Sequence, residues 1–390
     1  MDLEALRASP IGRLVPITGT DGRTAQHYEY FAYLADPLPE AVDLSPATWA
    51  AVVRAEAALA RLDEAARQIP DPALLRRPAL RREAQSTSAL EGTFAPLIDV
   101  LERDVADRAQ LSLEVREILN YVVAAEEAFA WVADRPLTSG FMGNLQRILV
   151  EGTPGQQSDA GGLRDRQVLI GARDAPIEEA RFVPAPFGDQ LRAGFERWVD
   201  WVNASDRDLP AVVQAALAHY QFETLHPFSD GNGRIGRLTI VLQLMRQRIL
   251  KHPILVVSPW FEARRTEYQD GLLALSKTGD WDAWVGFFAT GVGAAASTTH
   301  QRIDQLLSWQ QAALSQVREA GITGVAERIA GELAGAPILQ AGQVASQHGL
   351  SHQGAMNALR RLAELGLVAE RVRNGRITFH ADAVIQLLSQ

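Results

Sequence analysis

The sequence predicts a mainly α-helical protein with a small amount of β structure. Apolar residues recur at intervals of three and four over most of the 390 residues, which is the period of an amphipathic helix. Runs of the strand type are few and short. With 47% apolar and 22% charged residues the composition is that of a globular protein, and the length favours two or three domains.

Seven segments carry the helical pattern before the last seventy residues. The first starts after Ser45, a preferred helix cap that is followed by proline, a residue suited to the first helical turn. One helix is expected to start near Asp280, and a longer, more polar helix is expected to end at Gly321, since glycine commonly terminates helices. The predicted segments are 45–68, 111–132, 188–205, 209–226, 233–250, a helix from about 280, and 298–321.

Two short runs predict strands. They are Gln167–Gly171 and Arg181–Pro186, and the turn-rich residues between them indicate a hairpin.

The last seventy residues predict a separate small fold. A helix, a glycine-containing turn, a longer helix and two strands joined by Asn374-Gly375 follow one another, as in a winged helix-turn-helix. Such domains contact DNA or pack against protein, and both interpretations stay open. Five arginines make the segment locally basic: Arg360, Arg361, Arg371, Arg373 and Arg376.

Charge and composition exclude several classes of function. The net charge of −9 disfavours broad attraction to nucleic acid or anionic membrane. The sequence has no cysteine, so disulfides, thiolate metal sites and cysteine nucleophiles are excluded. The first residues lack the pattern of a signal peptide and no apolar run could span a bilayer, so we expect a cytoplasmic protein that does not enter a membrane.

One stretch, HPFSDGNGRIGR from His226 to Arg237, concentrates chemically active residues. Pro227 disfavours helical geometry at His226, so the preceding helix is expected to end there. Gly231 and Gly233 let consecutive backbone N–H groups converge at the start of the next helix, which makes an anion site.

The side chains of this stretch suit phosphoryl-group chemistry. Arg234 and Arg237 share one helix face, from which both can reach a polyphosphate. Asp230 offers a hard oxygen ligand of the kind Mg²⁺ prefers. His226 carries an imidazole, whose ordinary pKa of about 6.5 suits a general base. Each feature alone also occurs in ordinary turns and solvated helix faces, so the prediction depends on their order and spacing.

The stretch resembles the Fic family motif, H-x-F-x-(D/E)-G-N-G-R-x-x-R, at every fixed position. The resemblance implies transfer of AMP from ATP to a Ser, Thr or Tyr hydroxyl of a target protein, including the protein itself, with release of pyrophosphate. His226 would then deprotonate the hydroxyl, and Asp230 would hold Mg²⁺ between the α- and β-phosphates. Phe228 would anchor the loop by packing. The nucleotide-binding residues would be Gly231, Asn232, Gly233, Arg234 and Arg237, with Asn232 and the neighbouring amides at the α-phosphate.

The resemblance covers most of the chain. The 167–186 hairpin is similar to the Fic flap, in which Val168, Leu169 and Ile170 would pair with an extended target peptide. It implies an N-terminal Fic-associated region over 1–110, a Fic core over 111–300, a linker helix over 301–320 and the winged helix-turn-helix over 321–390. Homodimers are common among family members of this build, and a homodimer is therefore also expected.

A second stretch, STSALEGTF from Ser86 to Phe94, resembles the inhibitory motif of the family, (S/T)-x-x-x-E-(G/N). Thr87, Glu91 and Gly92 occupy its fixed positions. The resemblance implies that the Glu91 carboxylate takes the place beside Arg237 that the γ-phosphate of ATP needs.

Two alternatives remain beside autoinhibited AMP transfer. One is a hydrolase that removes AMP, with Glu91 orienting the attacking water. The other is a DNA-binding regulator whose Fic core senses nucleotide. The sequence identifies neither the target protein nor the oligomeric state.

Overall fold

The computed structural model describes residues 1–20, 27–67, 73–102, 111–171, 176–204, 208–373 and 376–389. The chain forms two compact units. The first comprises Met1–Ala60, Asn120–Lys251 and Trp260–Ala294, and the second comprises Arg61–Leu119, His252–Pro259 and Ala295–Gln390. The limits expected near residues 110, 300 and 320 remain predictions.

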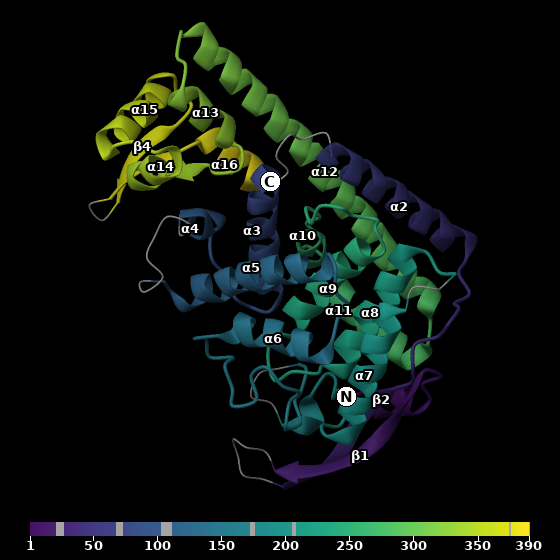
Figure 1. Ribbon diagram of the computed structural model, residues 1–390. Helices are drawn as coiled ribbons and strands as arrows, with labels where there is room; N and C mark the ends of the chain where they lie inside the picture. Colours follow the sequence, from purple (N-terminus) through teal and green to yellow (C-terminus); the bar gives the residue numbers. More distant parts are fainter. Residues whose placement is uncertain are drawn as a thin grey trace. The chain divides into compact units, whose positions relative to one another are not determined.

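The mainly helical fold is confirmed (Figure 1). Ser45 caps the helix that follows it, accepting a hydrogen bond from Thr48 N at 3.2 Å. The two helices predicted after Asp280 are one continuous helix of 39 residues. The helices are α1 (Leu3–Arg7), α2 (Pro46–Arg67), α3 (Ala73–Leu90), α4 (Leu97–Glu102), α5 (Leu113–Val132), α6 (Ser139–Val150), α7 (Asp189–Asn203), α8 (Ala211–Leu225), α9 (Asn232–Arg246), α10 (Ser258–Glu262), α11 (Arg265–Thr278), α12 (Trp281–Glu319), α13 (Val325–Glu332), α14 (Ala341–His348), α15 (His352–Glu364) and α16 (Asp382–Ser389).

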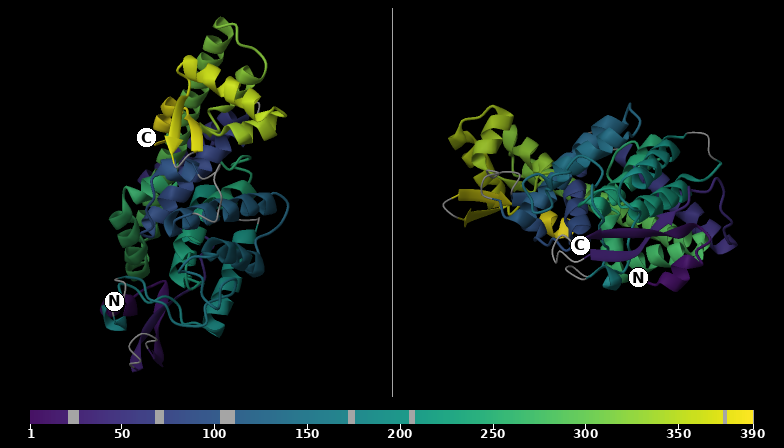
Figure 2. Two further views of the ribbon diagram at one scale, coloured as in Figure 1. Left: turned by 90° about the vertical axis from the view of Figure 1, so that its left-hand side faces the viewer. Right: turned by 90° about the horizontal axis from the view of Figure 1, so that it is seen from below.

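An antiparallel hairpin near the N-terminus was not predicted from the sequence. Strands β1 (Gly12–Thr20) and β2 (His27–Ala35) pair along their whole length, and Figure 2 shows the two side by side. The inner face of β2 is buried: Tyr33 packs with Leu6 and Phe182 in one apolar cluster. Tyr33 N also donates to Val183 O at 2.9 Å, so the hairpin holds the chain at Phe182–Val183.

The strands predicted at 167–171 and 181–186 are reduced to one bridge. Ile170 and Phe182 exchange two backbone hydrogen bonds, of 2.9 and 3.0 Å, and a short 3-10 helix, η3 (Ile177–Glu179), lies between them. The prediction of two full strands was therefore wrong. Pro184 and Pro186 explain the difference, because proline has no N–H to donate to a ladder.

The helix pair α8–α9 forms the centre of the first unit. Almost every side chain of α8 and α9 is buried, so neither helix shows an amphipathic stripe. Phe228 lies in the loop between them and packs edge-on against Phe195, with ring centroids 5.9 Å apart. It is 1% exposed, which supports its expected role as a packing anchor.

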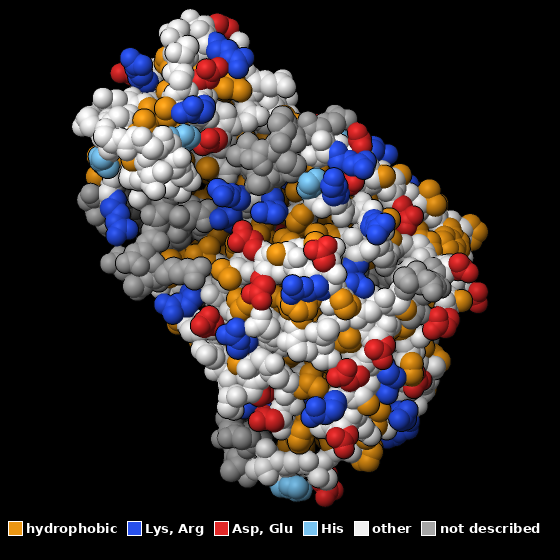
Figure 3. Space-filling model, in the orientation of Figure 1, with side chains coloured by type: hydrophobic (Ala, Val, Ile, Leu, Met, Phe, Trp, Pro, Cys, Tyr) orange, Lys and Arg blue, Asp and Glu red, His pale blue; other side chains and the backbone are white. Residues whose placement is uncertain are grey.

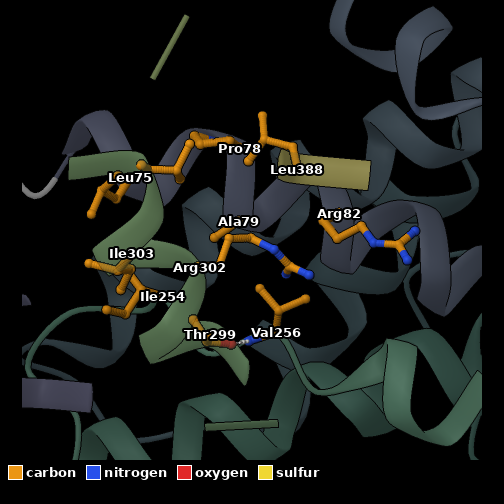
Figure 4. Close-up of a pocket in the computed structure, with 11 residues that line it drawn as sticks. Leu75, Pro78, Ala79, Arg82, Ile254, Val256, Thr299, Arg302, Ile303 and Leu388 are labelled. Atoms are coloured by element: carbon orange, nitrogen blue, oxygen red, sulfur yellow. Dashed lines mark hydrogen bonds between the residues drawn. The ribbon is translucent and has the colours of Figure 1, made fainter. Parts of the chain in front are cut away.

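The second unit contains α3, α4 and the C-terminal elements. Strands β3 (Ile338–Leu339), β5 (Arg376–His380) and β4 (Ala369–Arg373) form a three-stranded sheet in that spatial order, which is consistent with the predicted winged helix-turn-helix. The Asn374-Gly375 turn lies outside the described residues. Leu388 of α16 lines a small pocket with Leu75, Pro78 and Ala79 of α3 and Ile303 of α12, so α16 supports α3 (Figure 4). Within the described residues, no helix has both the length and the apolarity of a membrane span.

Candidate active site

The candidate base lies at the end of α8. His226 caps this helix with φ 50° and ψ 60°, a left-handed conformation that is uncommon for residues other than glycine. The helix thus ends at the position predicted from Pro227. Nδ1 of His226 lies 3.3 Å from Glu223 O. Because a carbonyl oxygen only accepts, Nδ1 carries the proton in this arrangement, and the basic lone pair belongs to Nε2.

The loop after His226 leads directly into the start of α9. Gly231 caps α9 at φ 85°, a conformation that favours glycine, and a Cβ there would lie 2.6 Å from Leu149 Cδ2, so the Leu149 side chain would have to move to admit a larger residue. The first hydrogen bond of α9 runs from Ile235 N to Gly231 O at 3.0 Å. The N–H groups of Asn232, Gly233 and Arg234 precede it and lack intrahelical acceptors, as in helix termini that bind anions.

The Asn232 side chain braces this loop. Its Oδ1 accepts from Phe228 N at 2.9 Å, its Nδ2 donates to Phe228 O at 2.8 Å, and the residue is 2% exposed. Both polar ends of the amide are therefore used inside the loop. Of the groups predicted to bind the α-phosphate, the backbone N–H of Asn232 suits that role better than its side chain.

The charged residues of the motif are gathered at the same helix start. Arg234 and Arg237 are 4% and 2% exposed, and Arg234 Nη2 lies 2.7 Å from Asp230 Oδ1. The side chain of Asp230 is 40% exposed, and Gly155 packs closely against its other oxygen. Among the described residues no three His, Cys, Asp or Glu side chains gather as a metal cluster. A single exposed carboxylate nevertheless fits Mg²⁺, which commonly takes one or two carboxylates together with substrate phosphates.

A buried histidine lies under this site. His219 of α8 has its Nδ1 3.1 Å from Gly236 O, and so donates to it, while Nε2 lies 2.8 Å from the hydroxyl of Tyr268 and accepts from it. Burial, reinforced by the positive charge of Arg237, lowers the pKa of His219 to about 3. His219 is therefore a neutral structural link between α8, the motif helix α9 and α11.

Three further residues hold the loop, and no motif in the sequence pointed to them. Gln146 Nε2 donates to Asp230 O at 3.1 Å, and Asp159 accepts from Ser229 Oγ at 2.5 Å. Arg164 is 2% exposed and donates to His226 O at 2.8 Å. In the sequence, Asp159 and Arg164 stand in a polar, glycine-rich stretch, which is typical of a solvated loop.

The predicted peptide-binding residues lie near the bridge between Ile170 and Phe182. Leu169 is 41% exposed, whereas Val168 and Ile170 are half-buried. This alternation leaves one side of the segment accessible. Pairing with an extended peptide requires such an accessible side. The role of these residues in target binding remains a prediction.

The predicted inhibitory residues occupy the end of α3. Thr87 is fully buried within the helix, Glu91 is the first residue after it, and Gly92 follows with φ 93°. Glu91 is exposed and lies at the C-terminal end of the helix, where the helix dipole disfavours a carboxylate. Glu91 belongs to the second compact unit and Arg237 to the first. Their pairing remains a prediction.

The C-terminal arginines are partly neutralised. Arg360 lies 3.3 Å from Glu370, and Arg371 lies 2.7 Å from Asp382, whereas Arg361 and Arg376 are exposed. The side chain of Arg373 lies outside the described set. On the face of the molecule in Figure 3, positive and negative side chains are interspersed. DNA contact by this region therefore remains a prediction. The two ion pairs argue against it, because they reduce the positive charge that could face DNA.

Sequence comparisons support the family resemblance. The Fic/DOC family N-terminal model matches residues 49–130, and the Fic/DOC family model matches residues 136–244. The chain is 34% identical over 132 residues to a protein adenylyltransferase Fic of Drosophila willistoni, covering 34% of this chain and 23% of that one. It is 38% identical over 89 residues to the protein adenylyltransferase fic-1 of Caenorhabditis elegans, covering 23% of this chain and 16% of that one. The chain thus spans about a quarter or less of the length of these relatives.

Solved structures share the fold. A Fic family protein from Desulfovibrio desulfuricans matches with a TM-score of 0.56 and 20% identity, over 87% of this chain and 97% of that chain. Residues 134–508 of Fic-1 from Caenorhabditis elegans match with a TM-score of 0.52 and 21% identity, over 67% and 74%. Residues 49–130 and 136–244 therefore contain the Fic/DOC N-terminal region followed by a Fic domain, and the fold is shared with solved Fic proteins.

Proposed function

We propose that this protein transfers AMP from ATP to a Ser, Thr or Tyr hydroxyl of a protein, itself included. The observation that carries the proposal is the place of the His226 imidazole at the start of the loop that leads into α9. Its Nδ1 donates to Glu223 O. A base for a hydroxyl and a cradle for phosphates thus belong to one short, braced loop.

The reaction follows from these groups. The target hydroxyl oxygen attacks the α-phosphorus, Nε2 of His226 takes the hydroxyl proton, and pyrophosphate leaves. The N–H groups at the start of α9 favour the charge on the α-phosphate, and Arg234 and Arg237 hold the outer phosphates. Asp230 would hold Mg²⁺, which supplies charge stabilisation on the phosphate oxygens when bound.

We further propose that Glu91 restrains this activity by occupying Arg237. Glu91 stands where the dipole of α3 disfavours it, so a cationic partner would stabilise it. A γ-phosphate and a carboxylate compete for the same guanidinium donors. ATP bound beside Glu91 would have its phosphates misplaced for in-line attack.

The test is self-labelling with ³²P-labelled ATP and Mg²⁺. Glu91→Gly is expected to label more strongly than the wild type. The double variant Glu91→Gly with Arg237→Ala should be inactive again. His226→Ala in the Glu91→Gly background should lower the rate of self-labelling by about 10²–10⁴-fold. Glu319→Gly is the matched control, because Glu319 is likewise a glutamate at the C-terminal end of a helix, shortly before a glycine with positive φ, Gly321.

Two outcomes would change the proposal. Equal labelling by the wild type and a well-folded Glu91→Gly variant would remove Glu91 from inhibition. If the wild type then released AMP from a modified protein and Glu91→Gly did not, the hydrolase alternative would replace transfer as the main activity.

A further inference from the structure

Arg164 is a buried cation in the segment between α6 and η3. It is 2% exposed, and no ion pair to it is found among the described residues. Burial lowers the pKa of Arg164 to about 10, and the negative charge of Asp159 opposes that shift. The guanidinium is therefore still charged at neutral pH, although removing it from water disfavours the charged form.

One set of contacts connects Arg164 to the candidate base. Its Nε donates to His226 O at 2.8 Å, its Nη2 lies 3.4 Å from Leu225 O, and its backbone N donates to Pro227 O at 3.0 Å. The last carbonyls of a helix lack intrahelical donors, and a cation at this end is favoured by the helix dipole. Arg164 thus supplies the donors that the end of α8 needs.

This capping bears directly on the conformation of His226. A non-glycine residue with φ 50° is sterically disfavoured and persists only where its surroundings hold it. The His226 carbonyl is fixed by Arg164, and the carbonyl of the next residue is fixed by the Arg164 backbone. The direction of the imidazole depends on the two peptide groups that flank His226, and their carbonyls, those of Leu225 and His226, both accept from the Arg164 guanidinium.

A second set of contacts connects the same guanidinium to the flap. Its Nη1 donates to Arg166 O at 3.0 Å, and its Nη2 donates to Ala185 O by a short hydrogen bond. These two carbonyls lie just outside the Ile170–Phe182 bridge, one on each arm of the flap. The planar guanidinium presents its donors in a rigid fork, so it fixes both arms relative to the end of α8.

We propose that Arg164 is a positioning residue that sets the distance between His226 and a peptide docked on the flap. It touches no reacting atom and acts through backbone carbonyls on both sides. The inference rests on the proposed transfer of AMP, since the flap and the base work together only if a protein hydroxyl is the acceptor.

The test compares Arg164→Met with Arg246→Met, both in the Glu91→Gly background. Arg246 is a matched control, because it is also partly buried and donates to a backbone carbonyl, Arg135 O, at 3.0 Å, within the same compact unit. For Arg164→Met we expect kcat of self-labelling to fall about 10²-fold, the scale expected for a misplaced catalytic group. The KM for ATP should stay within about threefold, because the phosphate cradle begins at Gly231. Arg246→Met should change neither constant.

A second measurement does not depend on activity. The ¹H–¹³C imidazole signal of His226, assigned by its loss in His226→Gln, should shift in Arg164→Met and stay in place in Arg246→Met. If the parent protein transfers no AMP while this shift appears, the proposed function fails but the positioning of His226 stands.

The proposal is overturned if Arg164→Met folds, keeps kcat within about threefold of its parent and leaves the His226 signal unmoved. Should Arg164→Met fail to fold, Arg164→Lys decides, since one ammonium keeps the charge but cannot serve both α8 and the flap. It should lower kcat about tenfold with the KM for ATP unchanged. Parent-like kinetics, or an equal change in the KM for ATP, would then overturn the proposal.

Discussion

Asn232 offers a test of how the loop geometry supports both stability and reaction. Its side chain makes two hydrogen bonds to one residue, accepting from Phe228 N and donating to Phe228 O. These two hydrogen bonds join the first residue of α9 to the middle of the loop between His226 and α9. Asn232→Ala removes both bonds and leaves the buried N–H and C=O of Phe228 without these partners.

The magnitude follows from that count. A typical hydrogen bond contributes about 1 kcal/mol net, and an orphaned buried polar group costs about 1–3 kcal/mol. Asn232→Ala orphans two such groups, so we expect it to lower the free energy of unfolding by about 2–6 kcal/mol. Asn232→Asp keeps the acceptor for Phe228 N but sets a carboxylate oxygen where Nδ2 stood, 2.8 Å from Phe228 O, so it should cost at least as much.

Asn203 provides a matched control outside the site. It ends α7 and brackets Leu137 in the same way, accepting from Leu137 N at 3.0 Å and donating to Leu137 O at 2.7 Å. Asn203→Ala should lower the urea midpoint by a comparable amount. Only Asn232→Ala should also lower kcat of self-labelling, by about 10²-fold, because His226 and the α9 amides lose their relative placement. Equal kcat values for the two variants would refute the reasoning.

Three further predictions concern pH, metal and packing. Burial lowers the pKa of His219 to about 3, so from about pH 6.5 down to about pH 3 only the unfolded chain takes up this proton. The contribution of His219 to the free energy of unfolding is therefore fully present above about pH 6.5, and it should fall by about 1.4 kcal/mol between pH 7.5 and 5.5. Urea unfolding should show a flatter pH dependence in His219→Gln, and identical slopes would contradict the assignment. Asp230→Asn should lower the rate of AMP transfer at least about tenfold, since charge stabilisation by the metal is worth several kcal/mol. It should also raise the MgCl₂ concentration that gives the half-maximal rate. An unchanged Mg²⁺ titration would exclude Asp230 as a ligand. Leu388→Ala should lower the free energy of unfolding, measured by heat or urea, by about 2–5 kcal/mol, because Leu388 is 2% exposed and packs against α3. Leu387 is half-buried, so Leu387→Ala should cost less. The reverse order would show that α16 does not support α3 in this way.

The helical class was predictable because each helix encodes its own period and ends. Ser45 and Pro227 act on neighbouring backbone atoms, so the start of α2 and the end of α8 follow from a few adjacent residues. The motif from His226 to Arg237 was predictable for the same reason, since its loop and the first turn of α9 are contiguous. Helices α8 and α9 were harder to delimit by pattern, because burial on all sides removes the polar face that marks a surface helix.

Contacts between distant segments were decided only by the tertiary structure. The β1–β2 hairpin depends on packing against Phe182, and the prolines at 184 and 186 limit the flap to one bridge. Arg164 looks like a solvated loop arginine in the sequence, because nothing near it predicts the carbonyls of His226 and Ala185 that it meets in the fold. The sequence by itself therefore determined which groups can carry the chemistry. Their orientation depends on hydrogen bonds between segments about 20 and 60 residues apart, and such bonds leave no periodic trace in a single chain.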